Sequence, residues 1–202
     1  YLFHKFSMNY AIDALVICVD PGPLNVRELP KALEDWLQLN QINSGSDGAK
    51  LFLALTKFDT HFPKAAGSDD DEVQRLRNAI ESGLIQPFAQ NESSWPKNWN
   101  GENFKNTFPI RNPNYPLEGY FKYNNGVEVE ICSEKLTRVK ELERGFLNAD
   151  LVREHVGDAS SKWDDLVAVN NGGVNYLVSQ IEALSLVELK SQNFDHQMAM
   201  IS

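Results

Sequence analysis

One segment, Lys50-Leu51-Phe52-Leu53-Ala54-Leu55-Thr56-Lys57-Phe58-Asp59, carries the strongest structural signal in this 202-residue chain. The run Leu51–Leu55 is apolar throughout, and no polar residue alternates within it. Such a run predicts a strand buried on both faces, as in a parallel sheet with helices on either side. The tetrad Thr56–Asp59 then falls at the carboxyl end of the strand, where open parallel sheets bind ligands. We therefore expect an α/β fold with a ligand site at this tetrad.

Two other stretches predict neighbours for this strand. The apolar run Ala14–Val19 ends at Asp20 and indicates a second buried strand, while Thr107–Pro113 indicates a third, short strand that runs into a turn. Pro30 can stand at the first position of a helix. The buried face of that helix would consist of Leu33, Trp36 and Leu37. Strand, helix and strand over this distance predict a right-handed crossover unit of a parallel sheet.

The next helix is expected to begin at Ser68, with Asp71 as its capping-box partner, and to stop at Gly83. Its acidic start, Asp69–Glu72, suits the positive end of a helix dipole. A calcium site is the less favoured interpretation, because the alternating ligand spacing and the glycine of calcium loops are missing.

A long polar stretch, Gln90–Lys105, separates this helix from the third strand. It carries Trp95 and Trp99 among Asn, Ser, Pro and Gly, which predicts a surface loop. We expect the two tryptophans to pin the loop to the domain rather than to stack on a ligand.

Residues from about 114 to 165 are expected to form an insertion. Asn124-Asn125-Gly126, between Tyr120–Tyr123 and Val127–Ile131, predicts a tight hairpin turn. A helix and then one or two short helices should follow, up to Asp165. The apolar face of the first of these would be Leu136, Val139, Leu142 and Phe146.

The last helix should begin near Asn171-Gly172-Gly173 and present an apolar face to the sheet. That face would consist of Val174, Leu177, Val178, Ile181 and Leu184. The two glycines could cradle a phosphate at the helix start, but no buried strand precedes them. A tight turn is therefore the favoured interpretation.

Composition disfavours several classes of partner, although a local basic cleft is still compatible with it. Nineteen basic and 28 acidic residues give a net charge of −9, which argues against nucleic acid or an anionic membrane as a general partner. No apolar stretch approaches the roughly 18 residues of a membrane span, and no secretory signal opens the chain. Cys18 and Cys132 are expected to be buried free thiols, which suit a reducing compartment. We expect a cytoplasmic protein, with a signal-less secretion route left open. Tyr1 in place of Met indicates a fragment of a longer polypeptide.

Thr56-Lys57-Phe58-Asp59 resembles the guanine-specificity motif of P-loop GTPases, which is Thr or Asn, then Lys, any residue and Asp. In that family the Asp carboxylate accepts hydrogen bonds from two donors on the edge of guanine, where adenine presents an acceptor. The Lys stem covers the base, and the first residue ties neighbouring loops together. The resemblance thus implies base-binding roles for Thr56, Lys57 and Asp59. A surface turn that carries a Lys and an Asp is the alternative.

The GTPase arrangement also implies roles for residues after the other strands. There the loop after the third strand contacts the base through its backbone, which places Arg111 and Asn112 among the base-binding positions. The Ser-Ala-Lys pattern usual at that place is absent. Asp20 resembles a Walker B aspartate, which holds magnesium, but the rigid turn Pro21-Gly22-Pro23 favours a structural role.

Over most of the chain, the order of elements resembles the second half of a P-loop GTPase domain. Four motifs also resemble the SrfC-type virulence factors, large bacterial proteins whose amino-terminal part is GTPase-like. They are Val19-Asp20-Pro21, Leu55-Thr56-Lys57-Phe58-Asp59, Arg111-Asn112-Pro113 and Asn171-Gly172-Gly173-Val174. The resemblance implies a three-layer Rossmann-like parallel sheet with a hairpin and helical insertion, in which residues 1–202 form a single, partial domain.

The phosphate-binding loop Gly-x-x-x-x-Gly-Lys-Ser/Thr does not occur in these 202 residues, nor does a convincing switch motif Asp-x-x-Gly. That loop holds the phosphates and the metal-bound nucleotide of a GTPase. GTPase activity, with GTP or GDP as ligand and Mg²⁺ held by the missing part, is therefore expected only in the full-length parent.

Two functions remain open. The chain can be the base-recognition half of a GTPase-like domain, working with the rest of the parent polypeptide. Alternatively, it can be a nucleotide-free Rossmann-like scaffold that meets a protein partner through residues 114–165. A hydrolase of another kind is disfavoured, because the chain has no Gly-x-Ser-x-Gly elbow and its four histidines form no ligand-spaced pair.

Overall fold

A computed structural model describes the chain over residues 14–20, 29–39, 51–63, 71–89, 94–117 and 119–184. Its main elements are, in order, β1 (Leu15–Val19), α2 (Leu29–Leu39), β2 (Leu51–Leu55), α3 (Glu72–Ile80), α4 (Gln86–Phe88), β3 (Thr107–Pro109), β4 (Phe121–Asn124), β5 (Val127–Ile131), α5 (Leu136–Asn148), α6 (Asp150–His155), α7 (Ala159–Val167) and α8 (Val174–Leu184). Two short 3₁₀ turns and one π turn lie between them: η1 (Phe58–His61), η2 (Glu81–Ile85) and η3 (Ser133–Lys135).

The predicted parallel sheet is present, with its strands in the order β1-β2-β3. Leu51 of β2 pairs with Leu15 of β1, and Leu53 of β2 pairs with Thr107 of β3, both in parallel register. All five side chains of the central strand β2 are buried, as its unbroken apolar run predicts. A mixed α/β fold built on a three-stranded parallel sheet is therefore confirmed.

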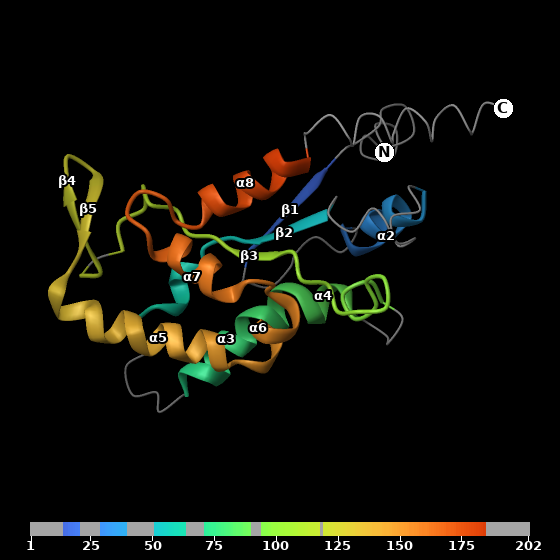
Figure 1. Cartoon of the computed structure of the whole chain (residues 1–202), viewed down its shortest axis with the longest axis horizontal. Coiled ribbons are helices and arrows are strands. Elements are labelled where there is room, and N and C mark those ends of the chain that lie inside the picture. The colour runs from blue at the N-terminus through green and yellow to red at the C-terminus, as the bar shows by residue number, and fades with distance from the viewer. Residues whose placement is uncertain are drawn as a thin grey trace.

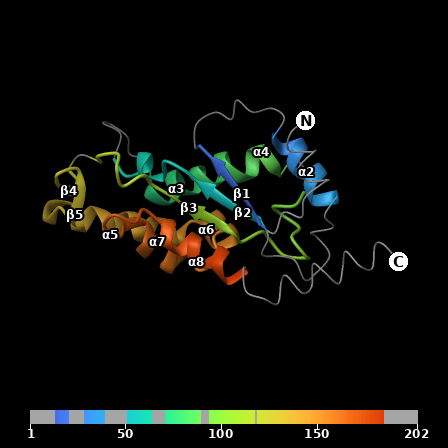
Figure 2. The same cartoon turned by 90° about the horizontal axis from the view of Figure 1, so that it is seen from above.

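Helices cover both faces of this sheet (Figure 1), with α8 on one side and α3, α5 and α6 on the other. The larger apolar layer contains Trp36, Leu53, Leu55, Phe146 and Trp163. The smaller layer lies under α8, where Leu177 packs with Phe52, Ala54 and Phe108. Figures 1 and 2 both place the hairpin β4–β5 and helix α2 at opposite ends of the molecule.

The edge strand β1 is less buried than its sequence suggests. Val16 and Cys18 are exposed, while Ile17 and Val19 on the other face are buried. The reason is that the packing of α8 is centred on β2 and β3 rather than on β1. Cys18 and Cys132 are free thiols as expected, but Cys18 is exposed and Cys132 half-buried. The prediction that both thiols are buried is therefore wrong.

The predicted helix after the tetrad begins later and continues further than its sequence signals indicate. Asp71 itself is the N-cap and accepts a hydrogen bond from Val73 N–H at 3.1 Å, while Ser68 lies outside the described residues. Gly83 does not stop the helix, which continues through η2 into α4. A Cβ atom at Gly83 would lie 2.5 Å from a methyl group of Leu55. The glycine therefore permits close approach to β2 rather than ending the helix.

Trp95 and Trp99 pin the loop before β3 to the core, as expected. Both are buried, and Trp95 packs edge-on against Phe104 with 4.9 Å between ring centroids. Phe88 at the end of α4 contacts Trp95 from the other side, at 5.4 Å. This aromatic cluster lets a polar, Gly- and Asn-containing segment follow a fixed path into β3.

The predicted hairpin and the short helices that follow it are also present. β4 and β5 pair antiparallel, and the turn between them uses positive φ angles at Asn125 (51°) and Gly126 (80°). This is the backbone that an Asn-Gly pair favours. The interpretation of residues 114–165 as an insertion stays a prediction.

Helix α8 begins where the Gly172-Gly173 pair predicts, but its apolar face is only partly buried. Leu177 is buried and Ile181 half-buried, whereas Val174 and Val178 are exposed, which corrects the predicted face. The side chain of Leu184 lies outside the described residues. No helix in the described ranges is long and apolar enough to cross a membrane.

Replacing Gly173 by Ala tests the contact between this turn and the sheet. Gly173 has φ 90°, and a Cβ atom there would lie 2.5 Å from the carbonyl oxygen of Pro109. Gly101 has a similar φ of 86° with no atom near the Cβ position, so Gly101→Ala is a matched control. We expect Gly101→Ala to lower the free energy of unfolding by about 1–2 kcal/mol through backbone strain alone. Gly173→Ala should cost at least about 1–3 kcal/mol more because of the added overlap. Equal losses in urea denaturation would contradict the close packing.

Candidate functional site

The backbone around Thr56 holds the ends of all three strands together. The N–H and the hydroxyl of Thr56 both donate to the carbonyl oxygen of Val19, at 2.8 and 3.1 Å. On the other side, Ile110 N–H donates to Leu55 O at 2.8 Å, and Ile110 O accepts from Phe58 N–H at 2.9 Å. The tetrad therefore lies at the carboxyl ends of β1, β2 and β3, the edge at which parallel sheets present ligand sites.

Lys57 turns the chain out of β2. It has a left-handed backbone conformation with φ 55°, which few residues other than glycine adopt. Its exposed ammonium group forms an ion pair with Asp20 after the end of β1, at 2.5 Å. The hydrogen bond to Asp20 and the charge of Asp20 raise the pKa of Lys57, with a smaller contribution from the phenol of Tyr115. Asp20, which resembles a magnesium ligand, thus holds the Lys57 side chain.

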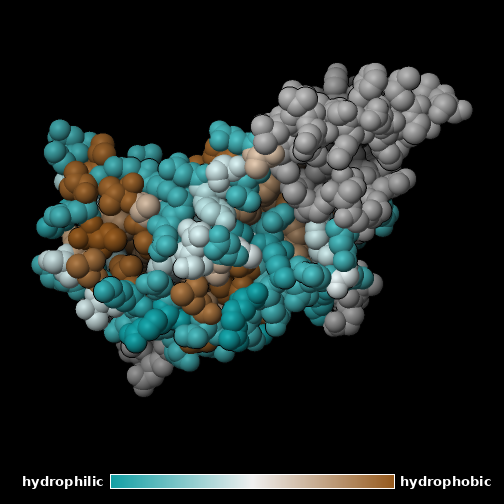
Figure 3. Space-filling model, in the orientation of Figure 1, coloured by the Kyte–Doolittle hydropathy of each residue, from teal (hydrophilic) through white to brown (hydrophobic). Residues whose placement is uncertain are grey.

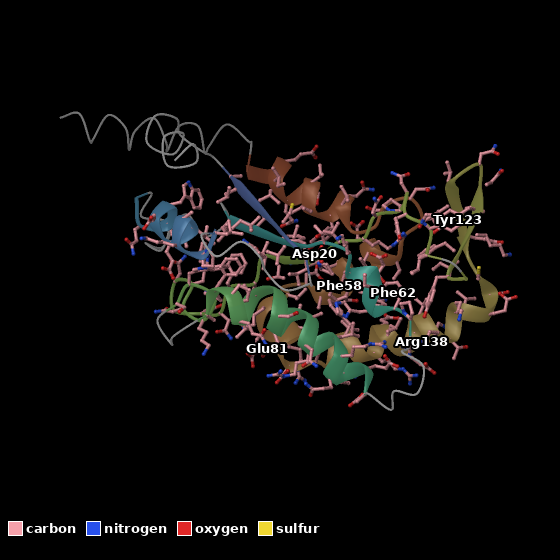
Figure 4. The ribbon with its side chains drawn as sticks, turned by 180° about the vertical axis from the view of Figure 1, so that it is seen from behind. Asp20, Phe58, Phe62, Glu81, Tyr123 and Arg138 are labelled. Carbon is pink, nitrogen blue, oxygen red and sulfur yellow. The ribbon has the colours of Figure 1, made fainter. Side chains whose placement is uncertain are left out.

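Two buried phenylalanines anchor the 3₁₀ turn η1 and the residue after it. Phe58 packs edge-on against Phe146 of α5, at 5.8 Å between ring centroids. Phe62 contacts both Tyr120 and Trp163, and the Tyr120 hydroxyl donates to Phe62 O at 2.7 Å. Figure 4 shows Phe58 and Phe62 between the sheet and the helices on its larger apolar face. The turn that carries Asp59 is therefore fixed by the segment that follows β3.

Asp59 is buried, with 8% of its surface exposed. Burial raises the pKa of its carboxyl group, while its own backbone N–H and the charge of Arg111 oppose this rise. Within the described residues, its carboxylate has no ion pair and no hydrogen bond to another residue. His61 adds no positive charge to the turn at neutral pH, because burial lowers its pKa to about 4. A carboxylate whose only internal hydrogen bond comes from its own backbone can accept further hydrogen bonds from a ligand.

Arg111, another predicted site residue, is 2% exposed and directed into the protein. Its guanidinium donates to both carboxylate oxygens of Glu128, to Leu166 O at 2.7 Å and to Ala168 O at 2.9 Å. It also lies 4.1 Å from the ring centroid of Phe121. The base contact of Arg111 stays a prediction, but in this structure its guanidinium is committed to the hairpin.

Asn112, in contrast, is exposed and shapes a turn. Its amide oxygen accepts from Asn114 N–H, and its carbonyl oxygen accepts from Tyr115 N–H, both at 3.0 Å. Because Ile110 is hydrogen-bonded to Leu55 before the tetrad and to Phe58 within it, this turn follows directly from the edge that carries Lys57. The base-binding role of Asn112 likewise stays a prediction.

Glu128, the partner of Arg111, is a key residue that the sequence does not single out. Asn170 clamps it: Asn170 N–H donates to Glu128 Oε2 at 2.9 Å, and its side-chain amide binds the backbone N–H and carbonyl of Glu128 at 3.0 and 2.7 Å. Alternation in Val127–Ile131 places Glu128 on the face opposite the valines. It does not reveal which of the two faces is buried, so this signal alone could not identify the pair.

Asp59, Glu128 and Arg111 together carry an uncompensated negative charge. The charge of Arg111 lowers the pKa of Asp59, and the charge of Glu128 raises it. The two carboxylates outnumber the single guanidinium, which is already paired with Glu128. The complement of such a group is a ligand that brings hydrogen-bond donors or positive charge to Asp59.

A second buried cation, Lys162 on α7, was also missed. Its ammonium group donates to Lys105 O at 3.2 Å and to Thr107 O at 3.0 Å, and it lies 3.8 Å from the ring centroid of Phe108. Burial lowers the pKa of Lys162 to about 7. Thr107 begins β3, so Lys162 lies at the opposite edge of the sheet from the tetrad and serves the packing of α7.

The contacts at the start of α8 favour the tight-turn interpretation of Gly172-Gly173. The Asp165 carboxylate accepts from Tyr176 N–H at 2.7 Å and from the side chain of Asn171. The amino terminus of the helix is thus occupied by a carboxylate of the same chain. A phosphate at this place would meet that negative charge.

Removing one partner of the buried ion pair between Arg111 and Glu128 tests how much this pair contributes to stability. Arg111→Met leaves Glu128 buried without its cation, and we expect the free energy of unfolding to fall by about 3–5 kcal/mol. The double variant Arg111→Met/Glu128→Leu should recover most of this loss, because it buries no unpaired charge. Lys122→Met breaks an exposed ion pair with Glu130 on the same hairpin and should have little effect. Urea denaturation measures all three, and a mild effect of Arg111→Met would contradict the assignment.

Lys162 predicts a pH dependence of stability. In the unfolded chain its pKa returns to about 10.5, whereas in the folded protein it is about 7. Between these values the unfolded state binds more protons, so the contribution of Lys162 to stability rises with pH from about 7 to 10.5. Lys162→Met should abolish this rise. Urea denaturation of both proteins at neutral and alkaline pH measures it, and parallel pH profiles would contradict the prediction.

Comparison with known proteins identifies a family. A family profile with the description "Putative bacterial virulence factor" matches residues 1–202. Neither a curated protein nor a solved structure gives a significant match. Because the profile spans the whole chain, this protein belongs to the family that bears this description.

Proposed function

We propose that this chain is the base-recognition half of a guanine-nucleotide-binding domain, with a Rossmann-like sheet as its framework. The observation that carries the proposal is Asp59, a buried residue beside the central strand of a parallel sheet, whose carboxylate is bound by no other described residue. Guanine offers two adjacent N–H donor groups, which match one carboxylate in a bidentate pair. The surplus negative charge of Asp59, Glu128 and Arg111 favours such a donor edge.

The other residues of the tetrad support this assignment. Thr56 ties the tetrad to β1 through its hydroxyl, the role that the first residue of the GTPase motif has. The stem of Lys57, directed by its ion pair with Asp20, would cover the base. Asn112 would contribute to the base site from the neighbouring turn, while Arg111 would act by positioning that turn and by its charge.

Phosphate binding and hydrolysis would need further parts. The 202 residues contain no Gly-x-x-x-x-Gly-Lys-Ser/Thr loop, so GTP or GDP would bind tightly, with Mg²⁺, only when the rest of a parent polypeptide supplies that loop. We therefore assign base selection to this chain and no catalytic residue.

A second candidate is an interaction scaffold without nucleotide. The observation in its favour is the hairpin, where Val127 and Val129 are 51% and 52% exposed. Figure 3 shows hydrophobic surface gathered at the hairpin end of the molecule. Exposed apolar groups of this kind mark surfaces that bind other proteins when they form a continuous patch. This function does not require base selectivity, so a binding experiment separates the two.

Asp59→Asn tests base recognition directly. Saturation-transfer difference NMR can detect millimolar binding of GMP, XMP and AMP to the 202-residue chain. We expect GMP to bind better than AMP, and Asp59→Asn to lose roughly tenfold or more in GMP affinity, the value of a charged hydrogen bond. The variant should prefer XMP, whose extra carbonyl an amide can serve.

Asp164→Asn on α7 removes the same charge from an exposed site and is the matched control. GMP binding by the wild type should also weaken as the pH falls through the raised pKa of Asp59, because only the carboxylate accepts both donors. If GMP and AMP bind the wild type equally, or Asp59→Asn behaves as Asp164→Asn, the scaffold is the better description.

A further inference from the structure

Tyr115 is an aromatic side chain that does not pack in the core. It is 70% exposed, more than any other large hydrophobic side chain in the described residues, and it is the only exposed aromatic among them. The other tyrosines and tryptophans there are buried or partly buried. An exposed phenol contributes nothing to the core, so its ring is accessible to a ligand.

The position of Tyr115 is fixed relative to the tetrad by backbone hydrogen bonds. Ile110 binds Leu55 and Phe58 at 2.8 and 2.9 Å, and Tyr115 N–H closes the following turn on Asn112 O at 3.0 Å. The phenol also raises the pKa of Lys57, as a smaller contribution after that of Asp20. Tyr115 thus lies on the same edge of the sheet as the side chains proposed to read the base.

A purine whose edge meets Asp59 still needs apolar surface for its faces. The stem of Lys57 is directed toward Asp20 by their ion pair and can cover only part of a base. Every base has a π face, and stacking on an aromatic ring is tolerant of base identity. A phenol on this edge of the sheet would therefore add affinity, whereas the carboxylate of Asp59 would add selectivity.

We infer that the ring of Tyr115 is the stacking surface for a purine base bound at Asp59. This inference rests on the proposed function and adds to it a residue outside the tetrad. It divides the site between two elements: the turn after β2 reads the edge of the base, and the turn after β3 supports its face.

The experiment compares Tyr115→Phe and Tyr115→Leu with the wild type, with GMP and XMP as ligands and AMP as the reference, by saturation-transfer difference NMR. Tyr115→Phe keeps the ring and should bind GMP within about twofold of the wild type. Tyr115→Leu keeps an apolar side chain but loses the ring, and we expect roughly tenfold weaker binding of GMP. The ratio of GMP to AMP affinity should be unchanged in both variants, unlike in Asp59→Asn.

Two outcomes would overturn the inference, and they differ in what else they remove. If the wild type prefers GMP and Tyr115→Leu binds it equally well, the stacking role fails while base recognition by Asp59 stands. If the wild type shows no preference for GMP, the proposed function fails and the stacking role with it. Because Tyr115 is exposed, both variants should keep the thermal midpoint of the wild type, which excludes misfolding as the cause of weaker binding.

Discussion

The buried ion pair between Arg111 and Glu128 is the contact on which the arrangement of the site depends. Arg111 follows β3, Glu128 lies in β5, and Asn170, which holds Glu128, comes shortly before α8. Taking two charges out of water costs several kcal/mol per ion, and only good geometry with further hydrogen bonds offsets this cost. Both conditions hold here, because Arg111 binds both carboxylate oxygens and two further carbonyls. The end of β3, the hairpin and the start of α8 therefore form one unit.

That unit also determines how rigid the tetrad is. Phe58 is hydrogen-bonded to Ile110 just before Arg111, and Phe62 is held by Tyr120 just before β4. The turn between them carries Asp59, so it is tied at both ends to the segment organised by the ion pair. An acceptor fixed in this way loses little conformational freedom when a ligand binds, and weak contacts then suffice for selectivity. The left-handed backbone of Lys57 fits this view, since strained conformations persist where the surroundings hold them.

Patterns among neighbouring residues predicted the helices and strands well, but they did not predict the contacts between residues far apart in the chain. The apolar runs located all three parallel strands, and the Asn-Gly pair located the hairpin, because these signals act over a few neighbouring residues. The exposure of Val16 and Cys18 could not be predicted, since it depends on where α8 packs. The role of Gly83 was predicted wrongly, because a glycine that permits the close approach of Leu55 cannot be distinguished in sequence from a glycine that ends a helix. At the site, the tetrad was visible, but Glu128 and Lys162 were not, because their partners are 17 and 55 residues away or more.

The burial of Asp59 supports the proposed site more strongly than the tetrad motif does. The other buried charged side chains of the described residues have internal partners: Arg111 and Glu128 hold each other, and Lys162 binds two carbonyls. Asp59 is bound only by its own backbone N–H and has no partner in another described residue. Burial raises the pKa of this carboxyl group, which means that its surroundings disfavour the charged form. Features that oppose stability in this way are characteristic of residues that serve a function. On the proposed function, the donor edge of a base would offset this cost, whereas a scaffold with no ligand at this edge would leave it uncompensated.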